Sequence, residues 1–274
     1  IYRSTRKLSL THEGQILLQH AQKMLLEAQT GLEKVVVNDQ ELKGKLSITL
    51  PSALTRSPLI SKIVQFCQSH PLIELNIVFS DVRQDLISDS FDLAVRIGDL
   101  EDSSFVSKKI GHIQRKLVCT PTFIEQQCLQ HNISTTVPSD LRSEDIQSWP
   151  WIKLSMLSNK RRFISRSNVV GVRNLAKTNN RKVEKGSSLE LEFTSHIAVD
   201  SVEAMTQFCL LGCGIATPPD FLVENAIKNK TLIELLPQWQ VEDLPLFAVW
   251  HNSSSVGGPV NKKVRRLMEY LTGD

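Results

Sequence analysis

A narrow apolar stripe near the start of the chain constrains the fold more than any other feature. Between residues 12 and 40 apolar side chains recur at spacings of 4, 3, 4, 4 and 3, at Leu17, Ala21, Met24, Ala28, Leu32 and Val35. Gln, Glu and Lys occupy the opposite face, which is the pattern of a coiled-coil seam. It predicts one helix of about 29 residues, ~43 Å long at 1.5 Å per residue. Packing on its own domain is one way to cover the stripe; we favour self-association, because the helix precedes the globular part.

A basic segment leads into this helix. Arg3, Arg6 and Lys7 are followed by Leu8 and Leu10 in alternation with polar residues, and then by Thr11 as a candidate helix N-cap. A short basic hairpin that feeds a helix can lay cations along a phosphate backbone. A solvated terminus is the other interpretation of these residues.

Beyond residue 44 the apolar period changes, and strands alternate with helices. The predicted strands are 46–50, 73–79, 93–97, 106–110, 116–119, 215–216, 232–236 and 246–250, with one further strand within 149–154 and one within 190–199. The predicted helices are 58–69, a short one near 85–88, 121–130, 202–211, 219–228 and 260–271. This alternation is typical of the α/β class with a parallel sheet.

Composition excludes several classes of protein. The chain has 274 residues, 41% hydrophobic and 22% charged, which suits a globular protein of two domains. It shows neither an apolar run of ~20 residues nor a signal peptide, so we expect no membrane partner and a cytoplasmic location. Five scattered cysteines do not form a disulfide framework, and the histidines are too dispersed for zinc, so we expect no metal or cofactor.

Positive charge is concentrated in one window, residues 159–185. This window holds nine Lys and Arg residues and one Glu, a formal charge of +8 in a chain whose total is +3. Such a stretch can recruit anions or nucleic acid. Its Asn, Ser and Gly content favours a solvated loop.

Three segments carry a resemblance to a known family. They are Arg3-Ser-Thr-Arg-Lys-Leu-Ser-Leu-Thr11 with Gly14, then Phe91-Asp-Leu-Ala-Val-Arg-Ile-Gly-Asp-Leu100, and Gly212-Cys-Gly-Ile-Ala-Thr-Pro-Pro-Asp220. Together they resemble the LysR-type transcriptional regulators over nearly the whole chain, apart from residues 158–192. The first segment is similar to the wing and the linker-helix start of that family.

The resemblance implies a domain plan. Residues 1–11 would be the remnant of a DNA-binding wing, and 12–43 the dimer-forming linker helix. A two-lobed effector domain, similar to a periplasmic binding protein, would follow, with lobe I at 44–118 plus 248–274 and lobe II at 119–247. The family's winged helix-turn-helix would precede the wing, so a chain that begins at Ile1 is expected to be a fragment or a mis-started reading frame.

The resemblance also implies partners and sites. The small-molecule effector would contact Ser52, Ala53, Thr55, Gly98, Asp99, Thr120, Pro121 and Ser201 in the cleft, although Ser52 and Ser201 could equally be helix N-caps. DNA backbone contacts would come from Arg3, Thr5, Arg6 and Lys7. Leu17, Ala21, Met24, Ala28 and Leu32 would form the seam of a homodimer or homotetramer.

Enzyme interpretations have little support in the sequence. Gly212-Cys-Gly214 looks like the start of a GxGxxG motif, but Thr217 stands at the sixth position and no helix follows directly. The motifs GxSxG, GK[ST] and HExxH do not occur. The remaining alternative is a two-lobed solute-binding protein of transport, which would need neither the basic hairpin nor the seamed helix. We therefore predict a regulator and no enzyme.

Overall fold

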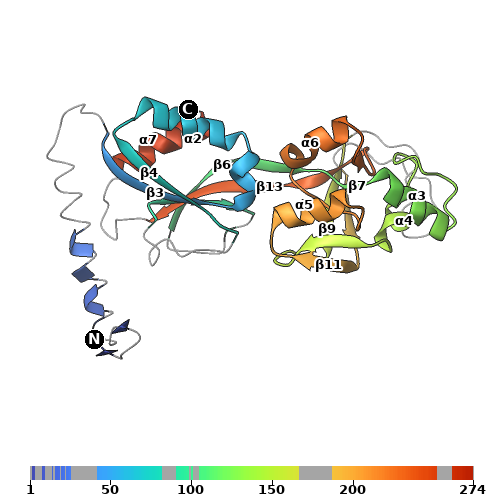
Figure 1. Ribbon diagram of the computed structural model, residues 1–274, viewed down its shortest axis with the longest axis horizontal. Helices are drawn as coiled ribbons and strands as arrows, with labels where there is room; N and C mark the ends of the chain where they lie inside the picture. Colours follow the sequence, from blue (N-terminus) through green and yellow to red (C-terminus); the bar gives the residue numbers. More distant parts are fainter. Residues whose placement is uncertain are drawn as a thin grey trace.

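The computed structural model describes residues 2–3, 8–9, 14, 16–18, 20–21, 23–25, 42–81, 91–98, 100, 105–166, 187–251 and 261–273. Most of this part of the chain forms two lobes that lie side by side along the long axis (Figure 1). Each lobe has its own hydrophobic core. Lobe I is the part within residues 42–113 and 244–273, around the core that includes Leu46 and Leu267. Lobe II is the part within residues 117–241, around the cores that include Trp149 and Met205.

Lobe I is built on a parallel sheet. Strand β3 (Gly44–Leu50) lies between β4 (Ile73–Phe79) and β5 (Leu93–Ile97), and both pair with it in parallel. The 3₁₀ helix η1 (Ser52–Arg56) follows β3, and α2 (Leu59–Ser69) packs against α7 (Lys262–Thr272). Alternate apolar residues of β3 pack in one core with apolar residues of α2 and α7. A parallel sheet covered by helices confirms the predicted α/β class.

Two long antiparallel strands connect the lobes. They are β6 (Phe105–Arg115) and β13 (Trp239–His251), and they pair along most of their length. The start of β13 pairs with β9 (Lys160–Ser165) in lobe II, and residues 246–249 of β13 pair with β5 in lobe I. One sheet therefore runs from one lobe into the other, and these two strands are the path along which the lobes can bend.

The described residues of lobe II form short strands and four helices. β8 (Trp151–Leu154) pairs in parallel with β11 (Ser195–Val199). β9 pairs antiparallel with β10 (Ser188–Glu192). β7 (Val118–Cys119) pairs antiparallel with β12 (Ile233–Glu234). The helices are α3 (Pro121–Gln130), α4 (Ser143–Gln147), α5 (Val202–Leu210) and α6 (Asp220–Lys228). Trp151 stacks on Phe193 at a centroid distance of 4.1 Å in the core.

Three local predictions need correction. Residues 190–199, expected to contain one strand, hold the end of β10 and the whole of β11, which belong to different sheets. The window from residue 159, expected as a loop, begins with strand β9, in which every second side chain is buried. Ile215 and Ala216 make only isolated bridges, to Trp151 and Val118. The helix near 85–88 lies outside the described residues.

The N-terminal part contains a small hairpin and helical turns. β1 (Tyr2–Arg3) pairs antiparallel with β2 (Leu8–Ser9), as the alternation predicted. Residues 14, 16–18, 20–21 and 23–25 are helical, and this segment lies away from both lobes (Figure 1). Residues 26–41 fall outside the described residues, so a single long helix over 12–40 stays a prediction.

Candidate ligand-binding site

A cavity of about 590 Å³ lies between the two lobes. Lobe I lines it with Ala53 of η1 and with Gly98 at the carboxyl end of β5, and lobe II with Val202 and Met205 of α5. Carboxyl ends of parallel strands are the usual place for ligands in open α/β sheets. The volume falls in the range of small-molecule sites, ~300–1,000 Å³.

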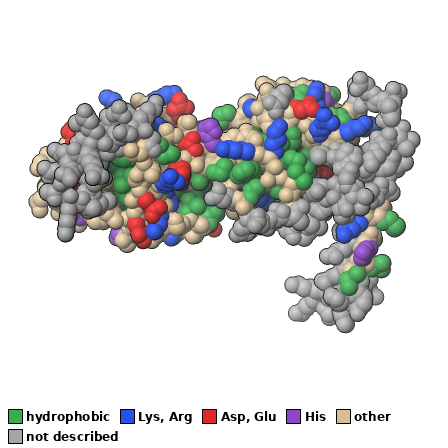
Figure 2. Space-filling model, turned by 180° about the vertical axis from the view of Figure 1, so that it is seen from behind, with side chains coloured by type: hydrophobic (Ala, Val, Ile, Leu, Met, Phe, Trp, Pro, Cys, Tyr) green, Lys and Arg blue, Asp and Glu red, His purple; other side chains and the backbone are tan. Residues whose placement is uncertain are grey.

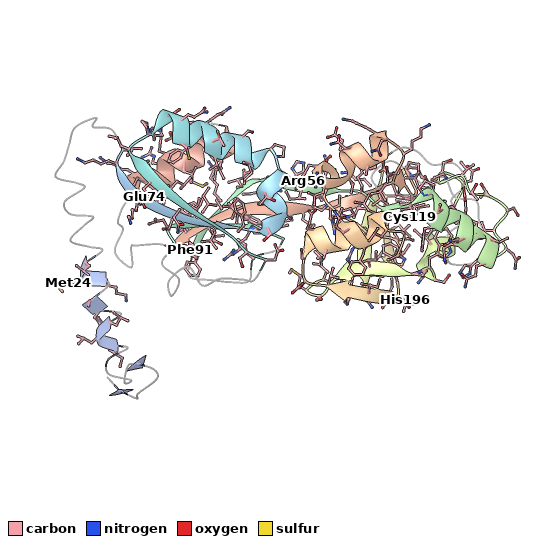
Figure 3. The ribbon with its side chains drawn as sticks, viewed as in Figure 1. Met24, Arg56, Glu74, Phe91, Cys119 and His196 are labelled. Carbon is pink, nitrogen blue, oxygen red and sulfur yellow. The ribbon has the colours of Figure 1, made fainter. Side chains whose placement is uncertain are left out.

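The two lobes approach each other at η1 and α5. Arg56 lies at the waist between the lobes (Figure 3), and its Nη1 is 3.9 Å from Oε1 of Glu203 on α5. About half of each side chain is exposed, so this ion pair contributes little to holding the lobes together.

Polar groups of the turn after β3 are used within lobe I. The backbone N–H of Ser52 donates to Oδ1 of Asp81 at 2.9 Å, and the Thr55 hydroxyl donates to the carbonyl of Ser52 at 2.8 Å. These bonds hold η1 in place behind Ala53, whose side chain is buried. The turn therefore presents an apolar surface to the cavity.

Arg115 and Thr217 form a polar floor in this cavity, with Arg161 behind Thr217. Arg115, the last residue of β6, donates from Nε and Nη2 to the backbone carbonyl of Glu242 at 3.2 and 2.5 Å. Arg161 of β9 donates from Nε to Oγ1 of Thr217 at 3.2 Å and from Nη1 to the carbonyls of Ser158 and Lys160, each at 2.8 Å. Both arginines are less than 10% exposed.

Burial affects the charge state of both guanidinium groups. It lowers the pKa of Arg115 to about 10; the charge of Arg161 adds to this effect, while Glu242 and Asp243 oppose it. Burial also lowers the pKa of Arg161 to about 10. Both groups are still cations at neutral pH, so the lobes enclose two positive charges close to the cavity.

The residues expected to bind an effector divide into three groups. Ala53 and Gly98 line the cavity, and Gly98 has φ +89°, which favours glycine. Ser52, Thr55, Thr120, Pro121 and Ser201 are not among the lining residues, and Asp99 lies outside the described residues. Thr120 and Ser201 cap helices, accepting from the N–H groups of Phe123 and Ala204 at 3.3 Å each.

The sequence reading missed the arginines and Thr217. Arg115 and Arg161 each stand beside other cations, Lys116 in one case and Lys160 and Arg162 in the other, and so read as surface charge. The alternation of β9 could have indicated burial of Arg161, because Phe163 and Ser165 share its face. Thr217 lies in the segment 212–220 that carries the family resemblance, and its residue type alone does not indicate that it lines a cavity.

A second hollow, of about 780 Å³, also lies between the lobes and is lined by α2, β6 and α6. We call it the outer groove. Its charges have partners within the protein: Lys116 Nζ is 3.0 Å from Glu234 Oε2, and Lys228 Nζ is 2.6 Å from Glu224 Oε1. From behind, apolar side chains reach the surface at the waist, beside Lys and Arg side chains (Figure 2). The outer groove is larger but leaves less charge to recognise a ligand.

Two searches of the described residues found nothing. No group of three or more His, Cys, Asp or Glu side chains in this part of the chain could hold a metal ion. Among the same residues, no helix is long and apolar enough to cross a membrane.

The residues expected to contact DNA or a second copy lie apart from both hollows. Arg3 is in β1, and Thr5, Arg6 and Lys7 lie outside the described residues. Leu17 and Met24 are helical and about 70% exposed, and Ala21 is partly buried. Ala28 and Leu32 lie outside the described residues.

Comparison with protein families and known proteins gives one consistent result. A family model described as the LysR substrate binding domain matches residues 39–273. A helix-turn-helix (HTH)-type transcriptional regulator of Haemophilus influenzae is 27% identical over 252 residues, which cover 92% of this chain and 78% of that protein. The HTH-type transcriptional regulator PtxR of Pseudomonas aeruginosa is 26% identical, over 98% of this chain and 78% of its own length.

Solved structures agree on the fold. The full-length Vibrio cholerae virulence activator AphB superposes with a TM-score of 0.62 at 19% identity, covering 99% of this chain and 82% of its own. CrgA of Neisseria meningitidis superposes with a TM-score of 0.60 at 24% identity, over 99% and 82% of the two chains. These likenesses extend to the two-lobed architecture that encloses the cavity.

Proposed function

This chain belongs to the LysR family, whose substrate-binding domain it contains, and from that premise we propose that the cavity between its lobes binds a small-molecule effector. The chain functions in the regulation of DNA-templated transcription, as its relatives do. A solute-binding protein of transport is not favoured, because the matching proteins are named as transcriptional regulators.

One observation carries the proposal: the ends of β3 and β5 in lobe I and helix α5 in lobe II line the same cavity, together with the buried cation Arg115. A ligand in this place contacts both lobes and therefore favours one angle between them. It can shift that equilibrium only by its difference in affinity for the two arrangements. Ala53 and Gly98 would belong to the site, together with Arg115, Thr217, Val202 and Met205.

Hydrogen exchange tests the location. The chain is screened against a library of small metabolites by thermal shift, and each stabilising compound is followed by amide exchange with mass spectrometry. We expect slower exchange at residues 51–54, 97–98 and 200–206 together, because these segments border the cavity from both lobes. Protection confined to α6 and α2, beside the outer groove, would contradict the proposal.

We propose further that the N-terminal segment supplies the other partners. Arg3, Thr5, Arg6 and Lys7 would contact the DNA backbone, and the protein would act in the cytoplasm, where DNA is found. Leu17, Ala21, Met24, Ala28 and Leu32 would form the seam of a homodimer or homotetramer. The exposed side chains of Leu17 and Met24 support this, since a partner helix would cover them.

Sedimentation equilibrium tests the seam. The double variant Leu17→Glu with Met24→Glu should raise the dimer dissociation constant at least about tenfold, because each buried leucine or methionine contributes about 1.5–3 kcal/mol. The control, Lys23→Glu, changes an exposed helical residue that is not in the stripe. A wild-type chain that stays monomeric at micromolar concentration would rule out the seam.

A further inference from the structure

Two buried cations beside the inter-lobe cavity lack an acidic partner. Within the described part of the chain, no carboxylate lies within the 4.0 Å of an ion pair from Arg115 or Arg161. Their hydrogen bonds go to neutral acceptors: three backbone carbonyls and the Thr217 hydroxyl. A buried charge without a counter-charge is costly, so such a pair is unusual where it serves stability alone.

The neighbouring acidic groups are engaged elsewhere. The carboxylate of Glu242 lies 3.4 Å from Nη1 of Arg162, and only its backbone carbonyl accepts from Arg115. Asp243 Oδ2 lies 3.5 Å from Nε2 of His112, and its Oδ1 accepts a hydrogen bond from Gln240 at 3.0 Å. These carboxylates moderate the field at Arg115 but do not bond to it.

The other charged groups that line the cavity are less buried than Arg115. Asp200 is exposed just before α5, and Asp81 accepts the Ser52 N–H. Arg96, on β5, adds a further cation to the wall. Of the charged residues that line the cavity, only Arg115 is buried, so the buried part of the lining is positive.

Arg115 and Thr217 also have hydrogen-bond donors without an acceptor among the described residues. Nε and Nη2 of Arg115 share one carbonyl, and its Nη1 has no acceptor among the described residues. The Thr217 hydroxyl accepts from Arg161 and keeps its own proton for donation. Two donors next to a buried positive charge suit an anionic head group with more than one oxygen.

The rest of the cavity is apolar. Leu154, Leu157, Val202, Met205 and Leu244 line it. At about 590 Å³ it is much larger than an inorganic oxyanion needs, and such an ion would leave these apolar walls without a partner. A ligand that complements the whole cavity therefore combines one anionic end with an apolar body.

We propose that the effector is an apolar organic acid whose anionic group binds at Arg115 and Thr217, while Arg161 supports Thr217 and adds positive charge from behind. This inference rests on the proposed function of the cavity and adds the chemical class of the ligand and its specificity-determining residues. The ligand supplies the counter-charge that the protein lacks, so binding also relieves the repulsion between the two arginines.

Titration calorimetry with matched acids and amides tests the inference. The probes are naphthalene-2-carboxylate, 4-phenylbutanoate and octanoate, each paired with its neutral primary amide, and sodium sulfate alone. We expect at least one acid to bind about tenfold or more tightly than its amide, because a charged group accepts the stronger hydrogen bonds.

Two neighbouring residues give matched variants. Arg115→Gln should weaken binding of that acid about 10- to 100-fold and leave its amide within about threefold. Lys116→Gln removes the same charge one residue further on, at the outer groove, and should leave both within about twofold. Thr217→Val should weaken the acid by a few-fold to about tenfold. If Arg115→Gln does not fold, the preference for acid over amide and the Thr217→Val result decide the question.

The outcomes separate the two levels of the argument. Equal affinities for acids and amides with exchange protection at the cavity, or no binding of any acid at millimolar concentration, would overturn the inference and leave the cavity as the proposed site. Sulfate that binds as tightly as the acids and competes with them would overturn the apolar part. Acid binding with protection outside the cavity, unchanged by Arg115→Gln, would overturn the proposed function itself.

Discussion

Arg115 and Lys116 are consecutive in the chain, yet they belong to opposite sides of the waist. Arg115 lines the inter-lobe cavity, is buried, and donates only to a carbonyl. Lys116 lines the outer groove, and its ammonium group lies 3.0 Å from the Glu234 carboxylate. One cation is neutralised within the protein and the other is not.

The comparison separates charge that maintains the structure from charge that is available to a ligand. At the outer groove, Lys116 and Arg166 both bind Glu234, each at 3.0 Å. At the cavity, the guanidinium groups of Arg115 and Arg161 are held by neutral oxygens, and the charge of Arg161 lowers the pKa of Arg115. The larger hollow is therefore the less suitable ligand site, because its cations Lys116 and Lys228 already have carboxylate partners.

Filling each hollow should produce the largest contrast. Val202→Trp places an indole in the cavity from the first residue of α5, and should weaken binding of an organic acid at least about 100-fold by removing its space. Ile227→Trp makes a similar change at the outer groove from α6, and should leave affinity within about twofold. Calorimetry measures both, and equal losses would remove the distinction between the two hollows.

Removing one cation from each side should produce a smaller contrast in stability. Arg161→Met leaves the carbonyls of Ser158 and Lys160 and the Thr217 hydroxyl without their donor, and should lower the free energy of unfolding by about 1–3 kcal/mol. Lys228→Met should leave it unchanged, because its pair with Glu224 is exposed. Urea denaturation measures both. A stabilised Arg161→Met would mean that repulsion from Arg115 outweighs these hydrogen bonds.

Changing the ion pair between Arg56 and Glu203 should have the smallest effect on ligand affinity. Arg56→Glu replaces attraction to Glu203 by repulsion and should change the affinity for an organic acid by less than about fivefold, since the pair is half exposed. The double variant Arg56→Glu with Glu203→Arg should restore the wild-type value. A loss that the double variant fails to reverse would show that η1 acts through its backbone or through Ala53 instead.

The sequence predicted most elements of the two lobes because their apolar periods are strong. Strands 46–50, 73–79 and 93–97 and helices 58–69, 121–130 and 202–211 lie within about two residues of β3, β4, β5, α2, α3 and α5. The break between β10 and β11 was missed, because residues 190–199 form one extended run whose division depends on different sheet partners. Strand β9 was missed because its cations masked its alternation.

The candidate site was harder to predict. Glycine and small residues at strand ends are visible in sequence, and two of them, Ala53 and Gly98, line the cavity. Hydroxyl residues at helix starts fit capping as well as binding, and Thr120 and Ser201 are caps. The residues expected in the N-terminal seam and wing fall mostly outside the described part of the chain and stay predictions.

By itself, the order of apolar and polar residues determined the α/β class, the basic hairpin and the family, because these depend on local periods and on short runs of residue types. Only the tertiary structure decided which cations are buried and unpaired. Arg115 and Lys116 look alike in sequence, but Arg115 is the last residue of β6 and lines the cavity, whereas Lys116 follows the strand and lines the outer groove. The partners of these two cations, Glu242 and Glu234, lie more than 100 positions away in the sequence. The residues next to Arg115 and Lys116 therefore cannot predict which of the two has a carboxylate partner.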